Sequence, residues 1–432
     1  MFEAAFQSAW MMAAQQPILP MVLILEIPLY ALIVAGIIRY RILHRRTRRA
    51  HQDHYPRVSC VITCYSEGEA VQNTIRSLAN QIYAGPIEIL AVVDGASANR
   101  ETWQALQRMK SELARSHQRA LKILPKWHRG GRVSSLNAGL QLSRGEIVMA
   151  LDGDTSFDND MVARAVCRMA EPGLLALTGT LRVRNRRTNL WTRFQALEYL
   201  VGLIATRTGL GAFNLINNVS GAFGVFRRDV LTRMGGWECG SAEDLDMTMR
   251  LKRYGRRRRD RRIGFEPLAI GHTDAPSSLR DLLKQRLRWD GDLFYIYVRK
   301  HRGALAPGIM GWPNLIATLW YGLLHQIVLP FVIVIYLVWI FLTRPMGEVL
   351  AGLMLIYGLY LLISLVMTLI AIGMLSERRA EDLPLLLLLP VFPLYRGVMR
   401  LWSAVAILAE VVLETHKDSN MAPWWILKRS RY

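Results

Sequence analysis

Cysteine is scarce in this chain, with four residues among 432. Cys60, Cys64, Cys167 and Cys239 form no C-x-x-C pair, and no histidine lies near them at the spacing of metal ligands. Because neither pattern is present, we expect neither a structural zinc site nor a framework of disulfides. The composition fits a reducing, cytoplasmic compartment.

Acidic residues are also few. The chain has 34 Asp and Glu against 54 Lys and Arg, so its formal net charge is +20, yet 52% of its residues are hydrophobic. That combination is typical of a membrane protein with basic surfaces rather than of a soluble nucleic-acid binder. The most basic stretch, RRRRDRR over residues 256–262, predicts contact with anionic lipid headgroups. We therefore expect the lipid bilayer, and no nucleic acid, among the partners.

Apolar runs of membrane-spanning length lie near both ends of the chain. Residues 17–40 are long enough to cross the hydrocarbon core, and the arginines over residues 39–49 predict that the following chain lies in the cytoplasm. A cleaved signal peptide is the competing interpretation, but its cations would precede the apolar run. Residues 313–342 and 349–375 predict a hairpin through the bilayer. Beyond this hairpin, one crossing, two crossings and an interfacial helix all stay open.

These runs divide the chain into four parts. We expect an N-terminal transmembrane anchor over residues 1–50, a cytoplasmic domain over 51–266, interfacial helices over 267–312 and a C-terminal transmembrane region over 313–432. The sequence therefore predicts a multi-pass protein of the cell inner (plasma) membrane, with its central domain in the cytoplasm.

The central domain alternates short apolar strands with helical stretches. Residues 58–63, 87–93 and 147–151 are apolar runs of strand length, and residues 69–81 have the periodicity of an amphipathic helix. This alternation, with acids directly after the strands, predicts a parallel α/β sheet. The ligands of such sheets bind beyond the carboxyl ends of the strands.

Acidic residues stand at these strand ends. Asp152 and Asp154 follow one strand and are separated by Gly153, which lets the backbone approach a ligand closely. Two carboxylates at this spacing can hold a divalent cation against a diphosphate, and their hard oxygens favour Mg²⁺ or Mn²⁺. A solvated acidic turn is the alternative, which the apolar strand before Asp152 disfavours. Asp94, at the end of another strand, can hydrogen-bond a uracil or a ribose, with a plain turn as its alternative.

A further pair of acids opens a predicted helix. In the segment 241–246, Asp244 is placed to take a proton from an acceptor hydroxyl, with Glu243 beside it. The alternative is ordinary helix capping by Ser241, followed by acids that the helix dipole favours. The residues alone do not decide between these interpretations.

One helical face carries an amide, a cation and an indole. Gln285, Arg288 and Trp289 lie at positions i, i+3 and i+4, which share a face of a helix. Arg288 would neutralise a departing diphosphate, and Trp289 would stack on the face of an acceptor sugar. An amphipathic interfacial helix with a snorkelling arginine is the alternative.

In this order and between membrane spans, the motifs resemble those of the membrane-integrated, processive family 2 glycosyltransferases. That group contains the cellulose, chitin, hyaluronan and poly-N-acetylglucosamine synthases. The resemblance covers residues 58–289 and the flanking spans. It implies an α/β nucleotide-sugar transferase domain, GT-A-like with a mostly parallel sheet, between N- and C-terminal transmembrane helices.

The resemblance also implies roles for individual residues and a Mg²⁺ or Mn²⁺ cofactor. The implied residues are Asp244, as the base, and Glu243 for catalysis; Glu67, Asp94, Arg132, Asp152, Gln285 and Arg288 for the donor; Ser220, Gly221, Phe223 and Trp289 for the acceptor; and Asp152 and Asp154 for the metal.

Three departures from the family pattern are visible. The usual P-x-Y-N-E is TCYSE at residues 63–67, and the usual G-G-K is Gly130-Gly131-Arg132, which keeps the charge but not the shape. The segment Asp290-Gly291-Asp292 is more acidic than the pattern predicts. These departures concern the donor and acceptor sides rather than the type of reaction.

The resulting hypothesis is an inverting, processive β-glycosyltransferase that elongates and exports a polysaccharide from a UDP-sugar. UDP-N-acetylglucosamine is the first expectation for the donor and UDP-glucose the second. The expected partners are the donor, the growing polysaccharide and accessory export or secretion subunits. Two alternatives stay open: a non-processive transferase that adds a sugar to a lipid carrier, and a catalytically inactive membrane scaffold.

Overall fold

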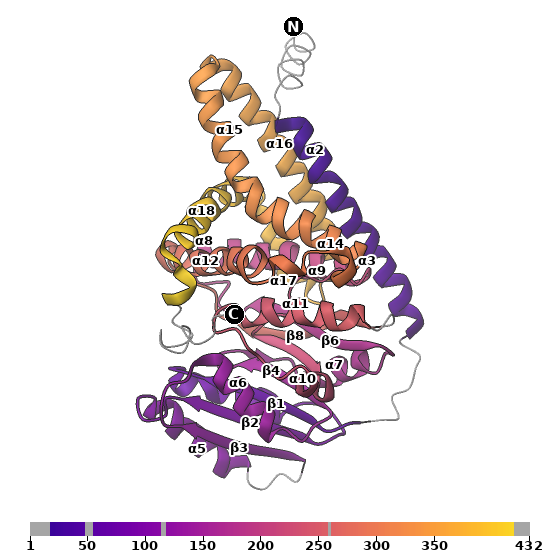
Figure 1. Ribbon diagram of the computed structural model, residues 1–432, viewed down its shortest axis with the longest axis vertical. Coiled ribbons are helices and arrows are strands. Elements are labelled where there is room, and N and C mark those ends of the chain that lie inside the picture. The colour runs from indigo at the N-terminus through magenta and orange to yellow at the C-terminus, as the bar shows by residue number, and fades with distance from the viewer. Residues whose placement is uncertain (1–17, 48–54, 114–117, 258–260, 419–432) are drawn as a thin grey trace.

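The computed structural model describes residues 18–47, 55–113, 118–257 and 261–418. An α/β domain lies at one end of the molecule, and long helices project from the other end (Figure 1). The predicted domain limit at residue 50 and the middle of the basic stretch 256–262 lie outside the described residues.

An eight-stranded sheet forms the α/β domain, with the strand order β3-β2-β1-β4-β7-β6-β8-β5. The strands are β1 (Val58–Cys64), β2 (Ile87–Asp94), β3 (Arg119–Lys126), β4 (Ile147–Asp152), β5 (Ser156–Phe157), β6 (Leu174–Val183), β7 (Phe223–Arg227) and β8 (Arg262–Thr273). Strands β3, β2, β1 and β4 are parallel, whereas β7 runs antiparallel to both of its neighbours. The sheet is therefore mixed, and parallel in the half where the sequence placed the acids.

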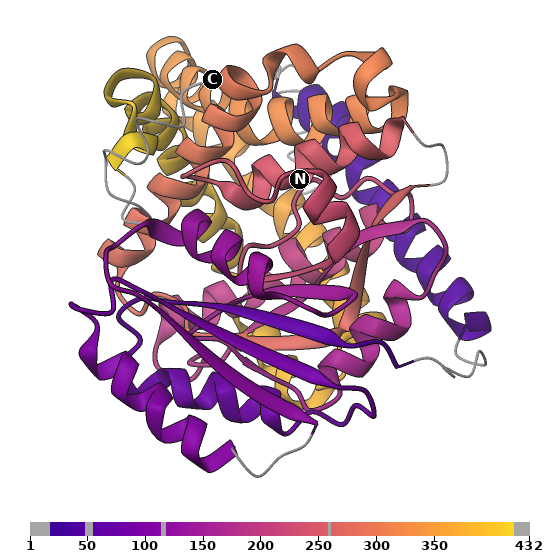
Figure 2. The same ribbon diagram turned by 60° about the horizontal axis from the view of Figure 1, so that its bottom comes forward.

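Helices cover both faces of this sheet (Figure 2). Successive side chains of a strand point to opposite faces, so Cys60 and Ile62 belong to one apolar cluster and Val61 to another. The first face is covered by α4 (Val71–Ala79), α5 (Arg100–Leu113) and α7 (Met161–Met169), and the second by α6 (Gly131–Leu142), α10 (Arg228–Arg233) and α11 (Glu243–Arg256). The strands are buried on both sides, as parallel strands usually are.

Further helices join the sheet to the membrane-facing part. They are α8 (Leu190–Glu198), η2 (Tyr199–Ala205), α9 (Thr206–Gly211), α12 (Leu279–Phe294), η3 (Tyr295–Lys300), η4 (Arg302–Ala304) and α13 (Pro307–Met310). The short helix η1 (Gly68–Ala70) instead precedes α4 within the α/β domain. The predicted interfacial helix corresponds to α12, which begins with Ser278 as its N-cap. Strand β8 runs through residue 266, where the sequence placed a domain limit.

Three helices in the described residues are long and apolar enough to cross a membrane, namely Val22–Leu43, Trp312–Thr343 and Met346–Leu375. Their elements are α2 (Ile18–Leu25) and α3 (Ile27–Thr47); α14 (Trp312–Ala317), η5 (Thr318–Val328) and α15 (Leu329–Thr343); and α16 (Met346–Ile370) and η6 (Ala371–Leu375). The predicted first span and hairpin match these helices. Glu26 in the first span is buried and accepts a 2.6 Å hydrogen bond from Tyr360 of α16.

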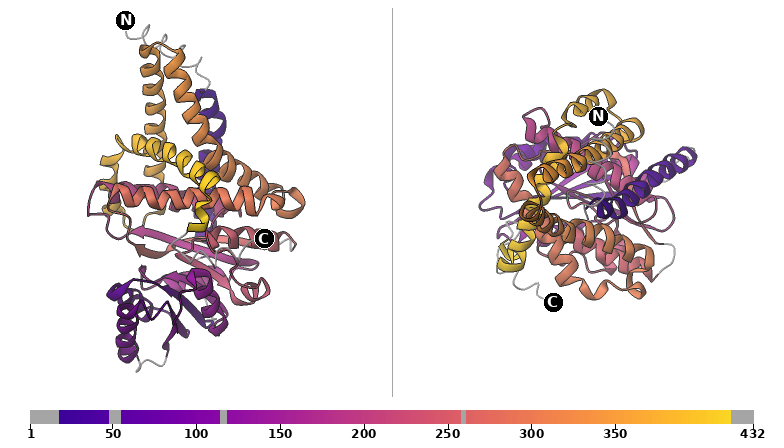
Figure 3. Two further views of the ribbon diagram at one scale, coloured as in Figure 1. Left: turned by 60° about the vertical axis from the view of Figure 1, so that its left-hand side comes forward. Right: turned by 90° about the horizontal axis from the view of Figure 1, so that it is seen from above.

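After the hairpin the described part of the chain turns back and forms a second group of helices, one of them long. It forms α17 (Arg379–Asp382), η7 (Leu383–Leu388), α18 (Phe392–Leu413) and η8 (Thr415–Asp418). Helix α18 packs against α12, where Trp402 Nε1 donates to the carbonyl of Leu283 at 2.8 Å. Figure 3 shows α18 crossing over α12 below the hairpin.

Contacts at several places in the described residues fix the α/β domain to the long helices and to the segment after them. Helix α3 lies against α9 at a pair of glycines, because a Cβ on Gly36 would lie 2.0 Å from the carbonyl oxygen of Gly209. On the other side, Arg182 of β6 pairs with Asp382, at 3.0 Å, in the segment after the hairpin. The cavity described below is lined by Leu210 of α9 and by Leu181 of β6, next to Arg182.

Candidate active site

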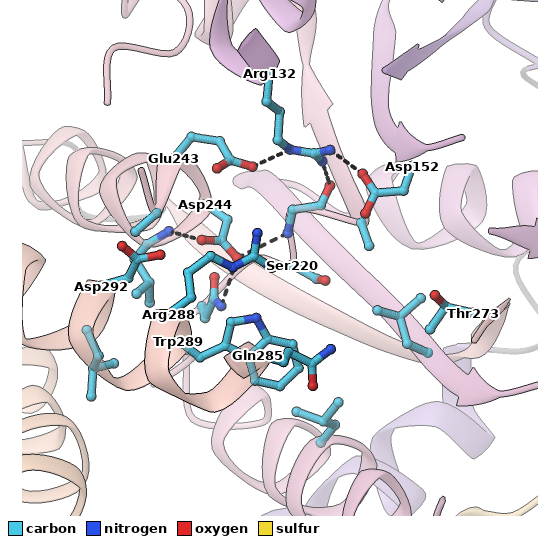
Figure 4. Close-up of a pocket in the computed structure, with 18 of the residues that line it drawn as sticks. Arg132, Asp152, Ser220, Glu243, Asp244, Thr273, Gln285, Arg288, Trp289 and Asp292 are labelled. Carbon is cyan, nitrogen blue, oxygen red and sulfur yellow. Dashed lines mark hydrogen bonds and ion pairs between the residues drawn. The ribbon is translucent and has the colours of Figure 1, made fainter. Parts of the chain in front are cut away.

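A cavity of about 680 Å³ opens between the carboxyl ends of the central strands and helix α12. Every residue that the sequence predicted for the site lines this cavity except Phe223. Figure 4 shows residues from α6, β4, α11 and α12 converging on it. Residues separated by more than 200 positions are therefore brought into one site.

Three carboxylates, those of Glu67, Asp152 and Asp154, gather in the part of the cavity at the end of β4. Asp152 ends β4, Asp154 follows two residues later, and a Cβ on Gly153 would lie 3.0 Å from Glu67 Oε1. Oε2 of Glu67 is buried and has no hydrogen-bond partner in the described part of the chain. Burial, together with the charges of Asp154 and Asp152, raises the pKa of Glu67 to about 7. Burial and the charge of Asp152 likewise raise the pKa of Asp154.

The three carboxylates of Glu67, Asp152 and Asp154 are suitable ligands for a divalent cation. A cation beside these carboxylates would relieve their mutual repulsion and supply a partner for the unpaired oxygen of Glu67. Among the described residues, no three acidic, histidine or cysteine side chains form a preassembled metal site. A Mg²⁺-like ion commonly takes one or two carboxylates and completes its shell with water and substrate phosphates, which is the arrangement that Asp152 and Asp154 would allow.

Asp94 is engaged with the glycine loop before α6. Its Oδ1 accepts hydrogen bonds from Lys126 Nζ at 2.6 Å and from the backbone of Gly130 at 2.8 Å, and its Oδ2 accepts from the backbone of Gly131 at 2.9 Å. Gly131 has φ +80°, a conformation that glycine adopts without strain. Asp94 lines the cavity, but its carboxylate holds the loop in shape.

Arg132 joins the part of the cavity around Asp152 to the part around Glu243. It follows this loop, and its guanidinium pairs with both Asp152 and Glu243. It also donates to Thr63 Oγ1 at 2.8 Å and to the carbonyl of Gly221 at 2.7 Å. One planar group with several fixed donors thus joins β1, β4, the loop before β7 and α11, which a lysine could not do.

Asp244 stands in the first turn of α11 and faces the cavity. Its Oδ2 accepts hydrogen bonds from Asn218 Nδ2 at 3.1 Å and from the backbone of Gly221 at 3.2 Å. These donors leave the carboxylate oriented toward the space above α12 (Figure 4). Burial raises the pKa of Glu243, which is 3% exposed, and the neighbouring Arg132 opposes that rise.

Ser241 does not cap α11. The N-cap is Ala242, which makes no capping hydrogen bond through its side chain and has φ +53°. The hydroxyl of Ser241 instead donates to Asp292 of α12. The alternative interpretation of Ser241 as a helix cap is therefore wrong.

Helix α12 presents its motif to the cavity. The Arg286 guanidinium lies 4.7 Å from the centre of the Trp289 ring and pairs with Glu198 at 2.7 Å. The indole is thus backed by a fixed cation on one side. Oε1 of Gln285 is buried and has no partner among the described residues, and Arg288 is exposed within the cavity.

The loop before β7 reaches the cavity only in part. Ser220 and Gly221 line it, as predicted. The side chain of Phe223 does not, because it is fully buried in the core and packs edge-on against Phe157 with 5.3 Å between the ring centres. Phe223 is the first residue of β7 and pairs with Leu151 of β4, so it belongs to the sheet and its side chain lies in the core.

Several cavity residues were missed at the sequence level. Asn218 and Arg286 contact predicted site residues, and Asp292 lines the cavity and accepts a hydrogen bond from Ser241. Nothing in the sequence around Asn218 or Arg286 predicts a site residue, because a single polar residue in a loop or helix is usually solvated. Asp292 could have been predicted, because it lies seven residues after Gln285, on the same helical face.

A second cavity of about 190 Å³ adjoins the first on the side of the long helices. The two share lining residues, among them Glu198, Arg286 and Tyr321. Tyr30 of α3 and Arg396 of α18 line only the second. Polar side chains therefore continue from the site toward the membrane-spanning helices.

Comparison with known proteins gives matches of three kinds. The model of "Glycosyltransferase like family 2" matches residues 56–291, a little over half of the chain. A poly-beta-1,6-N-acetyl-D-glucosamine synthase of Staphylococcus epidermidis is 30% identical over 236 residues, which are 54% of this chain and 53% of the relative. An N-acetylglucosaminyltransferase of Bradyrhizobium diazoefficiens is 29% identical over 249 residues, 55% of this chain and 49% of the relative. The matched region spans about half the length of these relatives.

A solved structure shares the fold. The mannosyltransferase of Pyrobaculum calidifontis, in complex with GDP-Man and Mn²⁺, superposes with a TM-score of 0.53 at 19% sequence identity. The superposition covers 89% of this chain and 99% of that chain. At this identity the similarity concerns the fold.

Proposed function

The chain belongs to the glycosyltransferase-like family 2, and on that premise we propose that it is an inverting, processive β-glycosyltransferase that elongates a polysaccharide from a UDP-sugar. The favoured donor is UDP-N-acetylglucosamine, and UDP-glucose is the second candidate. The observation that carries the proposal is the single cavity in which strand-end acids, Asp244 and the motif face of α12 meet. The polymer synthase of Staphylococcus epidermidis, similar over 54% of this chain, supports the choice of donor.

Asp152 and Asp154, with Glu67 beside them, would hold the divalent cation. Bound there, Mg²⁺ or Mn²⁺ would neutralise the charge of the donor diphosphate. The solved mannosyltransferase that shares the fold binds Mn²⁺, which supports the use of a divalent ion. Arg132 keeps Asp152 in place from the other side through its ion pair.

On the acceptor side, Asp244 takes the proton of the attacking hydroxyl. Asn218 and the backbone of Gly221 orient its carboxylate toward the cavity, so that the oxygen need not reorganise when the hydroxyl arrives. Arg288 neutralises the departing diphosphate, and Trp289, backed by Arg286, supports the terminal sugar of the acceptor. Gln285 offers its unpaired amide oxygen to a hydroxyl of the substrate.

The second cavity supports a path for the product. It continues from the active site toward α3 and α18, so we propose that the growing chain leaves through the protein's own helices. With three candidate spans, the protein would be a multi-pass protein of the inner membrane with its transferase domain in the cytoplasm. Accessory export or secretion subunits would meet the polymer on the far side.

UDP release by membranes that contain the full chain tests the proposal. The donors are UDP-N-acetylglucosamine, UDP-glucose, UDP-glucuronate and GDP-mannose, each with Mg²⁺ or Mn²⁺, and the product of any active donor is sized. A long polymer from UDP-N-acetylglucosamine is expected. A lipid that carries one sugar would move the function to a carrier-lipid transferase, and no turnover of any donor would favour the inactive scaffold.

A further inference from the structure

Asp292 lies on the motif-bearing face of α12. Gln285, Arg288, Trp289 and Asp292 occupy positions i, i+3, i+4 and i+7, which form one stripe along an α-helix. All four side chains line the same cavity. The acidic segment that departs from the family pattern therefore continues the motif by one helical turn.

The carboxyl of Asp292 contacts the turn that leads into α11. It accepts a hydrogen bond from the hydroxyl of Ser241, and the residue is only 8% exposed. Ser241 stands three positions before Asp244, and Figure 4 shows Asp292 on the same side of the cavity as Asp244. Helix α12 thus holds the segment that carries the base.

That segment contains a strained residue. Ala242 has φ +53° and ψ 41°, the left-handed conformation that alanine adopts only at a cost. Such a conformation persists where its neighbours hold it from several sides. Here the residue before it is held by Asp292, and the residue after it, Glu243, is held by Arg132. Loss of either contact would let the turn relax.

We propose that Asp292 is a positioning residue for glycosyl transfer: through the hydroxyl of Ser241 it holds the strained turn, and so fixes Asp244 relative to the acceptor-binding face of α12. The inference rests on the proposed function, because it assigns Asp244 as the base. Asp292 acts as a hydrogen-bond acceptor and does not touch the reacting atoms. Since burial raises its pKa to about 7, the acceptor is largely the neutral carboxyl below that pH, which an amide can replace.

The experiment compares kcat and donor KM of full-length variants in membranes, normalised to folded protein. The variants are Asp292→Ala, Asp292→Asn, Ser241→Ala and the double variant with both alanines. Asp281→Ala is the matched control, because Asp281 accepts a 2.6 Å hydrogen bond from Ser278 on the exposed start of the same helix.

We expect Asp292→Ala to lower kcat by about 10- to 100-fold, the loss that follows a misplacement of about 1 Å. Donor KM should change by less than about 3-fold, because the donor is held by other elements. Asp292→Asn should stay within about 3-fold of the wild type, and Ser241→Ala should reproduce Asp292→Ala. The double variant should be no slower than the slower single variant, and Asp281→Ala should match the wild type.

Four outcomes would overturn the inference. An Asp292→Asn variant as slow as Asp292→Ala would mean that the carboxyl acts on the substrate itself. Additive losses in the double variant would mean that the two residues act separately. If Asp292→Ala only reduces the amount of folded protein and keeps the wild-type kcat, the inference fails while the proposed function stands. A wild type without turnover of any donor would overturn the proposed function and this inference with it.

Discussion

Replacing Arg132 tests whether one guanidinium holds the two halves of the site together. In Arg132→Ala, Glu243, which is 3% exposed in the wild type, loses its cation, and Asp152 loses the same partner. Removing one member of a buried ion pair costs about 3–5 kcal/mol. Most of this cost falls on Glu243, because the side chain of Asp152 is 31% exposed. For a domain of roughly 200 residues such a loss lowers the unfolding midpoint by about 6–20 °C.

The activity should fall further than the stability alone explains. Arg132 also contacts Thr63 and the carbonyl of Gly221, and Gly221 donates to Asp244. Without these contacts both Asp152, the proposed metal-binding acid, and Asp244, the proposed base, are displaced, so kcat should drop by about 100-fold or more. Arg132→Lys keeps the positive charge but not the several fixed N–H donors of the guanidinium. We therefore expect its kcat to lie between those of Arg132→Ala and the wild type.

The assay combines thermal unfolding of the purified full chain in detergent with UDP release. The control is the double variant Arg132→Met with Glu243→Gln, which removes both charges and should recover much of the lost stability. It should not recover activity, because Asp152 and Gly221 still lack their partner. An Arg132→Ala protein with wild-type unfolding and turnover would refute the reasoning, and so would a double variant with wild-type turnover.

Three further predictions concern single side chains. Glu67→Gln should raise the Mn²⁺ concentration for half-maximal UDP release by about 10- to 100-fold, and an unchanged metal dependence would contradict a role beside the cation. Trp289→Ala should shorten the polymer while UDP release continues, and an unchanged product length would contradict processive elongation. Asp292 is protonated in the folded protein up to a pKa of about 7, whereas the unfolded chain loses this proton near pH 4, so this carboxyl destabilises the fold increasingly as pH rises between these values. The unfolding midpoint of Asp292→Asn should therefore exceed that of the wild type by a margin that grows from about pH 4 to about pH 7, and a margin independent of pH would contradict the raised pKa.

The parallel half of the sheet and the membrane spans could be predicted because local patterns determine them. Residues 58–64 and 87–94 are buried on both faces, and so the chain there is mostly apolar. Parallel strands also bring their carboxyl ends to one edge, which is why Asp94 and Asp152 lie close together. Length and apolarity likewise suffice to predict spans.

The contacts inside the site could not be predicted in the same way. Arg132 and Glu243 are 111 positions apart, and no local pattern states which acid a given arginine will meet. Phe223 shows the same limit, because its burial follows from the insertion of β7 between β4 and β6 in antiparallel direction. Asp94 was expected to contact the nucleotide, and its neighbours in space, Gly130 and Gly131, show that the carboxylate also shapes the loop.

The acidic segment after Trp289 has a structural meaning that composition hides. Asp290 accepts a 2.7 Å hydrogen bond from Ser403 of α18, and a Cβ on Gly291 would lie 3.4 Å from Cβ of Glu410 in the same helix. Asp292 contacts Ser241 on the opposite side. Three consecutive residues thus attach α12 to α18 on one side and to the turn at Ser241 and Ala242, just before Asp244, on the other. The turn before Asp244 and the long helix α18 are therefore both attached to α12, the helix that also presents Trp289 to the cavity.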